Sequence, residues 1–432
     1  MTAAARPRVL IAGGGFVGMY TALALESRLA PGEADLELVA PENFMLYQPL
    51  LPEVASGSVE PRHVVVPLRR ALRRTRVTLG RLCGVDRGRR VARIEAGTGE
   101  SRETAYDALV VGLGSVTRTM EVPGLIDHAV GFQTLTEAMH LRNQVLSRLE
   151  VADSATSAEA RRRALTFVFV GAGYAGVEAL AELEDLARQA SRSYRSISPG
   201  DMRWVLVEAT DRILPSVDEK LARRAGELLR ARGIEMRLQT TLEAVSDGVV
   251  SLSDGSTVAA DTLVWMPGVV PDPQVGRLGL GCDERGRLVV DACLRVEGAE
   301  GVWAAGDCAA VPGPDGEPYP PTAQHAEREA RQLGHNIAAV LRGRGPEPFR
   351  YRSRGEFVTL GNRRAIAQVM GMPLRGPAAW ALRRAYYLGR MPTTERRVRL
   401  LVDWLAGLPF EPDIAQLGAE QHPDRPLART AG

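Results

Sequence analysis

The sequence predicts an α/β protein with two Rossmann-like domains and a smaller α+β segment at its C-terminal end. Three observations lead to this fold class. Two apolar runs, at residues 9–12 and 167–170, each precede a glycine turn of the form GxGxxG and a helical pattern. The chain has 432 residues and is 45% hydrophobic, which is enough for two or three domains with cores of their own. A turn-rich stretch at residues 343–355 then leads into the third segment.

The first glycine turn lies close to the N-terminus. Gly13, Gly15 and Gly18 satisfy GxGxxG, with Phe16 between the last two, and a helical pattern continues over residues 19–25. In such a unit the first glycine permits a tight turn, the second lets the backbone approach a pyrophosphate, and the third lets the helix pack closely on the strand. The pyrophosphate then lies at the positive N-terminal end of the helix. These residues are therefore predicted to bind a dinucleotide.

The second glycine turn repeats this arrangement in the middle of the chain. Gly171, Gly173 and Gly176, with Tyr174 among them, follow the apolar run at residues 167–170. One such turn is weak evidence because it could be a plain tight turn, whereas two in the same strand–turn–helix setting favour two dinucleotide sites. One site then suits a bound flavin and the other an exchangeable nicotinamide, and electrons are expected to pass between them.

An acid is expected at the end of the next strand in each unit, where it accepts from a ribose hydroxyl. The second unit has Glu208 at the end of “MRWVLVEA”, which favours NADH over NADPH, although Arg212 is close by. The first unit departs from the rule, because “LELVAPEN” places Ala40 where the acid would stand. Glu42 is the candidate to replace it.

The composition excludes several other classes of function. The formal net charge is only +2, so charge does not indicate nucleic-acid binding. No stretch approaches the roughly 18 consecutive apolar residues of a membrane span, and the N-terminal run leads directly into a glycine turn rather than a cleavage site. The four cysteines form no CxxC pair and no metal site, which fits a reducing, cytoplasmic setting; they are Cys83, Cys282, Cys293 and Cys308.

Two further segments resemble motifs of flavoproteins with two dinucleotide-binding domains. “GVWAAGDCAA” at residues 301–310 is a short apolar strand that ends in Gly306 and Asp307. The resemblance implies that Asp307 hydrogen-bonds the ribityl chain of FAD and that Gly306 permits its close approach. “YDALVVGLGS” at residues 106–115 resembles the segment where such chains leave the first nucleotide domain, and its small-residue turn ends in Gly114.

Four longer segments are similar to those of type II NADH:quinone oxidoreductases, in the family order over nearly the whole chain. They are “NFMLYQPLLPEVASG” (43–57), “VPGLIDHAVGFQTLTEAMHLRN” (122–143), “RILPSVDEKL” (212–221) and “PPTAQHAEREA” (320–330). The single-polypeptide actinobacterial branch is especially similar. The family architecture implies a discontinuous FAD-binding domain (1–130 and 275–345), an NAD(P)H-binding domain (131–274) and a C-terminal domain (346–432) with a membrane-surface or dimer helix.

The resemblance also assigns roles to single residues. Glu178 matches the acid that lies beside the isoalloxazine and the nicotinamide; the alternative is a charge that only complements the dipole at a helix N-terminus. Gln324 matches the glutamine of the quinone site, where Ala323 and Ala326 are small enough to admit a flat ring. A loop near the flavin is implied for Tyr47, Gln48 and Pro49.

Several positions depart from the family pattern on the acceptor side. Arg354 stands where a lysine is common, and Arg328 or Glu329 stands where a glutamine is usual. Residues 266–269 read MPGV instead of TAGV, which keeps Gly268 in a loop expected near the nicotinamide or the flavin. These departures leave the identity of the electron acceptor open.

The predicted function is an FAD-dependent NADH dehydrogenase that does not pump protons. A hydride passes from NADH to FAD, and two electrons then pass to a quinone or another small-molecule acceptor. The alternatives are a soluble NAD(P)H-dependent flavin oxidoreductase with a non-quinone acceptor, and a non-catalytic flavoprotein that senses NADH. A disulfide reductase is disfavoured because no cysteine lies between Gly18 and Cys83, and a sulfide:quinone oxidoreductase because Cys308 has no evident partner.

The last segment contains an amphipathic pattern at residues 395–410. An apolar face is predicted for five of its residues, with Arg396, Arg399 and Asp403 opposite; the five are Val398, Leu401, Val402, Leu405 and Leu408. Together with Trp404, Phe410 and Arg397, this helix could lie flat on an anionic membrane at the inner face of the cell membrane. A core helix or a homodimer contact has the same stripe, so both interpretations stay open.

Overall fold

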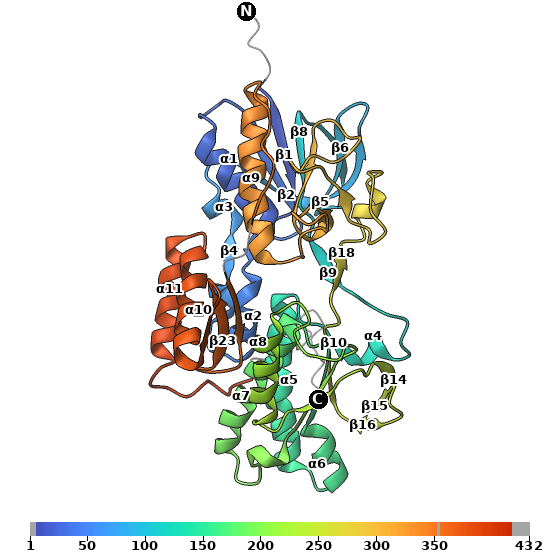
Figure 1. Cartoon of the computed structure of the whole chain (residues 1–432), viewed down its shortest axis with the longest axis vertical. Helices are drawn as coiled ribbons and strands as arrows, with labels where there is room; N and C mark the ends of the chain where they lie inside the picture. The colour runs from blue at the N-terminus through green and yellow to red at the C-terminus, as the bar shows by residue number, and fades with distance from the viewer. Residues whose placement is uncertain (1–5, 352–354, 417–432) are drawn as a thin grey trace, which may run out of the picture.

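The computed structural model describes residues 6–351 and 355–416. Two α/β units lie one above the other in Figure 1, and the C-terminal segment packs along one flank. The predicted fold class, two Rossmann-like units with a smaller α+β segment, is confirmed. Arg354, one of the predicted departures from the family pattern, lies outside the described residues.

The upper unit is built on a seven-stranded sheet in the order β20-β8-β1-β2-β5-β6-β7. Five strands run parallel: β1 (Arg8–Ala12), β2 (Asp35–Ala40), β5 (Arg76–Asp86), β8 (Ala108–Val111) and β20 (Val302–Ala304). β6 (Val91–Ala96) and β7 (Ser101–Ala105) extend the sheet in the antiparallel sense. Because β20 pairs with β8, the chain returns to this sheet after it has built the lower unit.

Two helices cover one face of this sheet. α1 (Phe16–Arg28) follows the first glycine turn, and α9 (Ala323–Leu341) packs beside it (Figure 1). Their contact is close at Gly334, where a Cβ atom would overlap the Cβ atom of Ala24. Small residues on both helices therefore bring the N-terminal end of α9 close to the first glycine turn.

The lower unit contains a five-stranded parallel sheet in the order β10-β17-β11-β12-β13. Its strands are β10 (Ala129–Val130), β11 (Thr166–Val170), β12 (Arg203–Val207), β13 (Glu235–Arg237) and β17 (Thr262–Trp265). An antiparallel sheet lies beside it: β14 (Leu242–Ser246), β15 (Val249–Leu252) and β16 (Thr257–Ala259). The helices of this unit are α5 (Leu135–Ser154), α6 (Ala158–Ala164), α7 (Tyr174–Ala190) and α8 (Glu219–Arg230).

Two antiparallel strands connect the units. β9 (Ser115–Thr117) leaves the upper unit and pairs with β18 (Val269–Pro271), which returns from the lower one (Figure 1). Shorter elements complete the two units: β3 (Phe44–Leu46), α2 (Leu51–Ala55), β4 (Val65–Pro67), α3 (Leu68–Ala71), α4 (Leu125–His128), β19 (Leu288–Val289) and β21 (Ala309–Ala310).

The C-terminal segment forms an antiparallel sheet followed by two helices. Its elements are β22 (Gly355–Thr359), β23 (Ala365–Val369), β24 (Met372–Arg375), α10 (Gly376–Arg390) and α11 (Thr394–Ala406). β22 and α2 both contact α7, so this segment closes over the junction of the two units. Across residues 6–351 and 355–416, we find no helix with the length and apolar character that a membrane crossing needs.

The predicted apolar face of the last helix is largely exposed, with one correction. Val398, Leu401, Val402 and Leu405 are between 43% and 56% exposed, so this face does not belong to the core. Trp404, predicted to face the membrane together with Phe410, is instead buried and donates from Nε1 to Glu53 Oε2 at 2.7 Å. α11 also ends at Ala406, so the exposed Leu408 and Phe410 follow the helix rather than extend it.

Candidate functional site

The first glycine turn has the close contacts that only glycine permits. Gly13 has φ of +110°, and a Cβ atom there would overlap the carbonyl oxygen of Gly112. A Cβ atom on Gly18 would in turn overlap the carbonyl oxygen of Gly13, which fixes α1 against the end of β1. At Gly15, by contrast, a Cβ atom would meet nothing within 4 Å. The middle glycine therefore faces open space at the start of α1.

The second turn has the same geometry. Gly171 has φ of +102°, and a Cβ atom there would overlap the carbonyl oxygen of Met266. A Cβ atom on Gly176 would overlap the carbonyl oxygen of Gly171, whereas one on Gly173 would have nothing within 4 Å. In both turns the outer glycines serve packing, and the middle glycine borders free space where a ligand can approach the backbone.

The N-terminal ends of α1 and α7 differ from those of α5, α8 and α9. Gly15 and Gly173 occupy the N-cap positions, and neither helix has a side-chain cap or an acid in its first turn. α5, α8 and α9 are capped instead by the side chains of Thr134, Asp218 and Thr322. The first N–H groups of α1 and α7 are thus left for an anion, and the helix dipole favours negative charge there. These ends fit the pyrophosphates of two dinucleotides.

Gly306 and Asp307 lie directly after β20, beside α1 and α9. Gly306 has φ of +71°, and a Cβ atom there would lie 2.7 Å from Val17 Cγ2. Asp307 Oδ2 accepts from Ser115 Oγ at 2.7 Å, and burial raises the pKa of Asp307. The Gly306 N–H donates to Glu329 Oε2 at 2.7 Å, and burial raises the pKa of Glu329 to about 7. A second acid, Glu329, therefore lies next to the predicted flavin motif.

The two loops that join the units begin with glycines from the predicted set. Gly114 precedes β9 and Gly268 precedes β18, and these strands pair with each other. Both glycines have positive φ, +73° and +115°, and a Cβ atom on either would meet nothing within 4 Å. The structure thus brings Gly114 and Gly268 to the junction between the units.

The predicted ribose acids have different surroundings. Glu208 follows β12; its Oε2 accepts from the Ala172 N–H at 2.6 Å, and its Oε1 accepts from Thr210. These bonds hold the carboxylate beside the second glycine turn. Glu42 lies two residues past the end of β2 and is exposed. Ala40, at the place of the usual acid, packs so closely that a Cβ atom on Gly14 would lie 2.7 Å from its own Cβ.

Glu178 is buried in the second turn of α7. Its Oε1 accepts from the Thr359 N–H at 2.8 Å and lies 3.5 Å from Arg383 Nη2. Burial raises the pKa of Glu178, although the Arg383 charge acts in the opposite direction. The first turn of α7 has no acid, so the interpretation of Glu178 as a charge that only complements the helix dipole is wrong.

Sequence reasoning missed the buried charges around Glu178. Arg383 Nη1 donates to Glu53 Oε1 at 2.7 Å, and its Nη2 donates to the carbonyl oxygen of Pro49 at 3.0 Å. Glu182, one turn after Glu178, accepts at Oε1 from Thr359 Oγ1 at 2.8 Å, and burial raises its pKa to about 7. The sequence does carry one sign of this cluster, which is the presence of acids inside the apolar runs “LLPEVA” and “VEALAEL”. An acid on a buried face needs a charged or hydrogen-bonding partner.

Gln324 lies in the first turn of α9. Its Nε2 donates to the Tyr351 hydroxyl at 2.6 Å, and the guanidinium of Arg328 lies 4.2 Å from the centre of that ring. His325 contacts Thr322 Oγ1 at 2.7 Å, and burial lowers its pKa to about 4. Ala323 opens α9, and Ala326 packs near Gly306. Gln324 therefore contacts residues of its own helix end and Tyr351, whereas Glu178 contacts β22 and α10.

Aromatic residues connect the first glycine turn to the C-terminal segment. Phe16, the first residue of α1, has its ring centre 5.6 Å from that of Tyr47, which lies 6.2 Å from that of Tyr387 in α10. Gln48 Nε2 donates to the Gln133 carbonyl oxygen at 3.3 Å. The predicted loop around Tyr47 thus contacts α1, α10 and the residues just before α5. Tyr174, at the start of α7, is hydrogen-bonded to Glu356 of β22.

Comparisons with known proteins agree with this arrangement. The model of the pyridine nucleotide-disulphide oxidoreductase family matches residues 7–330. The demethylphylloquinone reductase NdbB of Synechocystis is 32% identical over 93% of this chain and 96% of its own. The type II NADH:quinone oxidoreductase Ndh of Mycobacterium tuberculosis is 30% identical over 92% of this chain and 87% of its own. The solved structure of NDH2 from Plasmodium falciparum with NADH superposes with a TM-score of 0.88, at 16% identity, over 95% of this chain and all of that one.

Proposed function

The chain belongs to the pyridine nucleotide-disulphide oxidoreductase family and, within it, to the type II NADH:quinone oxidoreductases, and from this premise we propose how its residues divide the reaction between them. The protein is an FAD-dependent oxidoreductase that oxidises NADH and reduces a quinone. Bound FAD supplies the two-electron chemistry that links these two reactions. The observation that carries the proposal is the pair of uncapped helix N-termini, on α1 and α7, in units that meet at one junction.

We propose that the upper unit holds FAD. The free N–H groups at the start of α1 bind the pyrophosphate, and Asp307 accepts from the ribityl hydroxyls while Ser115 orients its carboxylate. Glu42 is the candidate for the ribose acid. The predicted FAD-binding set is Gly13, Gly15, Phe16, Gly18, Glu42, Gly114, Gly306, Asp307 and Ala323. This unit corresponds to residues 1–130 and 275–345.

The lower unit, residues 131–274, is proposed to bind NADH. The N-terminal end of α7 takes the pyrophosphate, and Glu208 accepts from the adenosine ribose, because both lie beside Gly171. A carboxylate there repels a 2′-phosphate, and the Arg212 side chain donates to the Pro215 carbonyl oxygen at 2.7 Å, which supports NADH over NADPH. The predicted NADH-binding set is Gly171, Gly173, Tyr174, Gly176, Glu208 and Gly268.

Glu178 and Gln324 are the proposed residues of the reaction itself. Glu178 is buried, hydrogen-bonded and next to Arg383, so it can hold or release a proton in a site from which water is excluded. Gln324 has an amide that can donate to a quinone carbonyl oxygen once it exchanges its bond with Tyr351.

The substitution Glu178→Gln tests this assignment. We expect it to slow NADH:quinone turnover by about 10²-fold or more while FAD stays bound, because the amide keeps the shape but cannot bind or release a proton near neutral pH. Glu219→Gln, which removes an exposed acid at the start of α8, is the matched control and should leave turnover unchanged. Equal rates in the wild type and Glu178→Gln would remove Glu178 from the reaction.

We further propose that the protein works in the cytoplasm at the inner face of the cell membrane, through α11. Four exposed apolar residues of this helix lie beside the exposed Arg397 and Arg399, which suits a surface of anionic lipid. The test is co-sedimentation with anionic lipid vesicles, compared with neutral ones. Binding to anionic vesicles alone is the expected result. A dimer in solution that binds neither kind of vesicle would assign the face to a second copy of the chain.

A further inference from the structure

The reaction needs a proton from solution, and this inference rests on the function proposed above. NADH oxidation supplies two electrons and one proton, whereas reduction of a quinone to a quinol takes up two electrons and two protons. The balance is NADH + H⁺ + quinone → NAD⁺ + quinol. One proton per turnover must therefore enter a junction that buried side chains close off from water.

Two acids of α7 meet at one residue of β22. Thr359 donates from its backbone N–H to Glu178 Oε1 and from its hydroxyl to Glu182 Oε1, both at 2.8 Å. Residues four apart on a helix lie on the same face, so the two carboxyl groups are neighbours on either side of Thr359. Glu178, Glu182 and Thr359 are 8%, 4% and 1% exposed. Thr359 thus holds both carboxyl groups in one buried row, Glu182 through its hydroxyl and Glu178 through its backbone N–H.

The charges around this row leave one carboxyl group without a cation of its own. The Glu53 carboxylate of α2 pairs with both arginines of α10, with Arg383 at 2.7 Å and with Arg384 at 3.3 Å. Arg383 also lies 3.5 Å from Glu178, so two arginines face three buried acids. Of the three, Glu182 is attracted least by the arginines.

The other charged groups near Glu182 do not supply that cation. Asp185 of α7 adds negative charge and is paired with Arg232 and Arg364 at 3.5 and 3.2 Å. Burial and the neighbouring acids raise the pKa of Glu182 to about 7, a value at which a carboxyl group both binds and releases a proton at neutral pH.

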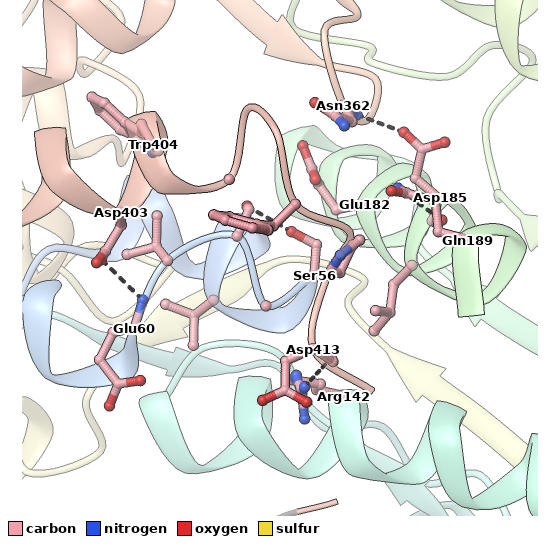
Figure 2. A pocket seen from close by; sticks show the side chains of 18 of the residues that line it. Ser56, Glu60, Arg142, Glu182, Asp185, Gln189, Asn362, Asp403, Trp404 and Asp413 are labelled. Carbon is pink, nitrogen blue, oxygen red and sulfur yellow. Dashed lines mark hydrogen bonds between the residues drawn. The ribbon is translucent and has the colours of Figure 1, made fainter. Parts of the chain in front are cut away.

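A cavity of about 400 Å³ reaches Glu182 from outside. It lies between α5, α7, α11 and the segment after α11, and Figure 2 shows Glu182, Asp185 and Gln189 directed toward it from α7. Its lining includes the exposed Glu60 and Glu411, so the cavity continues to the surface. Glu182 lines this cavity, whereas Glu178, one helical turn earlier in α7, does not.

We propose that Glu182 takes up the proton of each turnover from this cavity and passes it through Thr359 to Glu178. When Glu182 is protonated, it donates to the Thr359 oxygen, and the Thr359 hydroxyl turns from Glu182 to Glu178 and passes its hydrogen there. Glu178 then gives its proton to the quinol oxygen, and Glu182 is protonated again from the cavity. No electron moves through these residues. Glu182 is a positioning and relay group that acts through Glu178 and does not itself touch the substrate.

The test compares two acceptors in the purified, FAD-loaded protein. A short-chain quinone needs protons, whereas ferricyanide accepts electrons alone. Glu182→Gln keeps an oxygen that can accept from Thr359, yet it cannot carry a proton. We expect it to lower quinone turnover by about tenfold or more, to leave ferricyanide turnover within about twofold, and to remove the pH dependence near pH 7. The control Asp403→Asn changes another acid of the same cavity, one that contacts His63, and should preserve both rates.

Two further measurements separate a relay from a structural role. Thr359→Val should slow quinone turnover as Glu182→Gln does, and Thr359→Ser, which restores the hydroxyl, should recover it. The infrared absorption of protonated carboxyl groups should titrate near pH 7 in the wild type, and Glu182→Gln should lose the part that Glu182 contributes, while Glu329 keeps its own part.

Three outcomes would overturn the relay. They are an equal loss of turnover with both acceptors in Glu182→Gln, equally slow quinone turnover in Thr359→Ser and Thr359→Val, and an unchanged infrared band in Glu182→Gln. Wild-type protein that reduces ferricyanide but no quinone would instead contradict the proposed function, and the infrared titration would still decide whether Glu182 holds a proton.

Discussion

Substitution of Gly173 by alanine separates the binding role of the second glycine turn from its role in folding. Gly173 has φ of −70°, which alanine adopts without strain, and its Cβ atom would meet no protein atom within 4 Å. The proposed pyrophosphate approaches the backbone at this point, so the methyl group would displace it from the first N–H groups of α7. The variant should therefore fold normally and bind NADH poorly.

The expected magnitude follows from the bonds that would be lost. A hydrogen bond to a charged group contributes about 1.5–3 kcal/mol, so losing one or two of them raises the Kd for NADH by about 10- to 100-fold or more. Fluorescence titration with NADH gives the Kd. The free energy of unfolding should change by less than about 0.5 kcal/mol, as is usual for surface substitutions that cause no strain. FAD content should equal that of the wild type.

Two other glycines provide the controls. Gly15→Ala, the same change at the start of α1, should reduce FAD retention and leave the Kd for NADH near the wild-type value. Gly171→Ala places a Cβ atom at φ of +102° against the Met266 carbonyl oxygen, and it should destabilise the fold by about 2 kcal/mol or more. Wild-type NADH affinity in Gly173→Ala would refute the proposed position of the pyrophosphate.

Four further substitutions test other parts of the structure. Trp404→Phe removes the hydrogen bond to Glu53 and should lower the free energy of unfolding in urea by about 1.5–3 kcal/mol; no change would contradict the buried placement of this ring. The raised pKa of Glu329, about 7 against an ordinary 4.5, stabilises the fold at low pH. That stability, about 3 kcal/mol, is lost as the pH rises from about 4.5 through 7. The melting temperature of Glu329→Gln should therefore fall less over this range than that of the wild type. Val402→Glu should abolish vesicle binding without changing the melting temperature because Val402 is 56% exposed, whereas Leu400→Glu places a charge at a fully buried position and should unfold the segment.

The parts of the fold set by short-range pattern could be predicted from the sequence. The two strand–turn–helix units follow from local glycine spacing and apolar runs, and they occur as β1–α1 and β11–α7. The amphipathic last helix was also predicted, because a helical face is a local property. Its end at Ala406 and the burial of Trp404 were not, since they depend on contact with Glu53, about 350 residues away in the sequence.

The charged cluster of the candidate site could likewise be predicted only in part from the sequence. Glu178 could be singled out through its place after a glycine turn. Glu53, Glu182 and Arg383 come from three helices, α2, α7 and α10, and only the tertiary fold brings them together. No local pattern indicates that Arg383 is fully buried, because an arginine on an amphipathic helix is ordinarily at the surface.

The central claim is that electrons pass from NADH through bound FAD to a quinone, and rapid mixing without oxygen tests it most directly. The purified protein is mixed with NADH while the flavin absorbance is followed, and a short-chain quinone is then added. The account predicts bleaching by NADH and rapid recovery on addition of quinone. Bleaching that no quinone reverses would contradict it and assign the NADH site to a reductase with another acceptor.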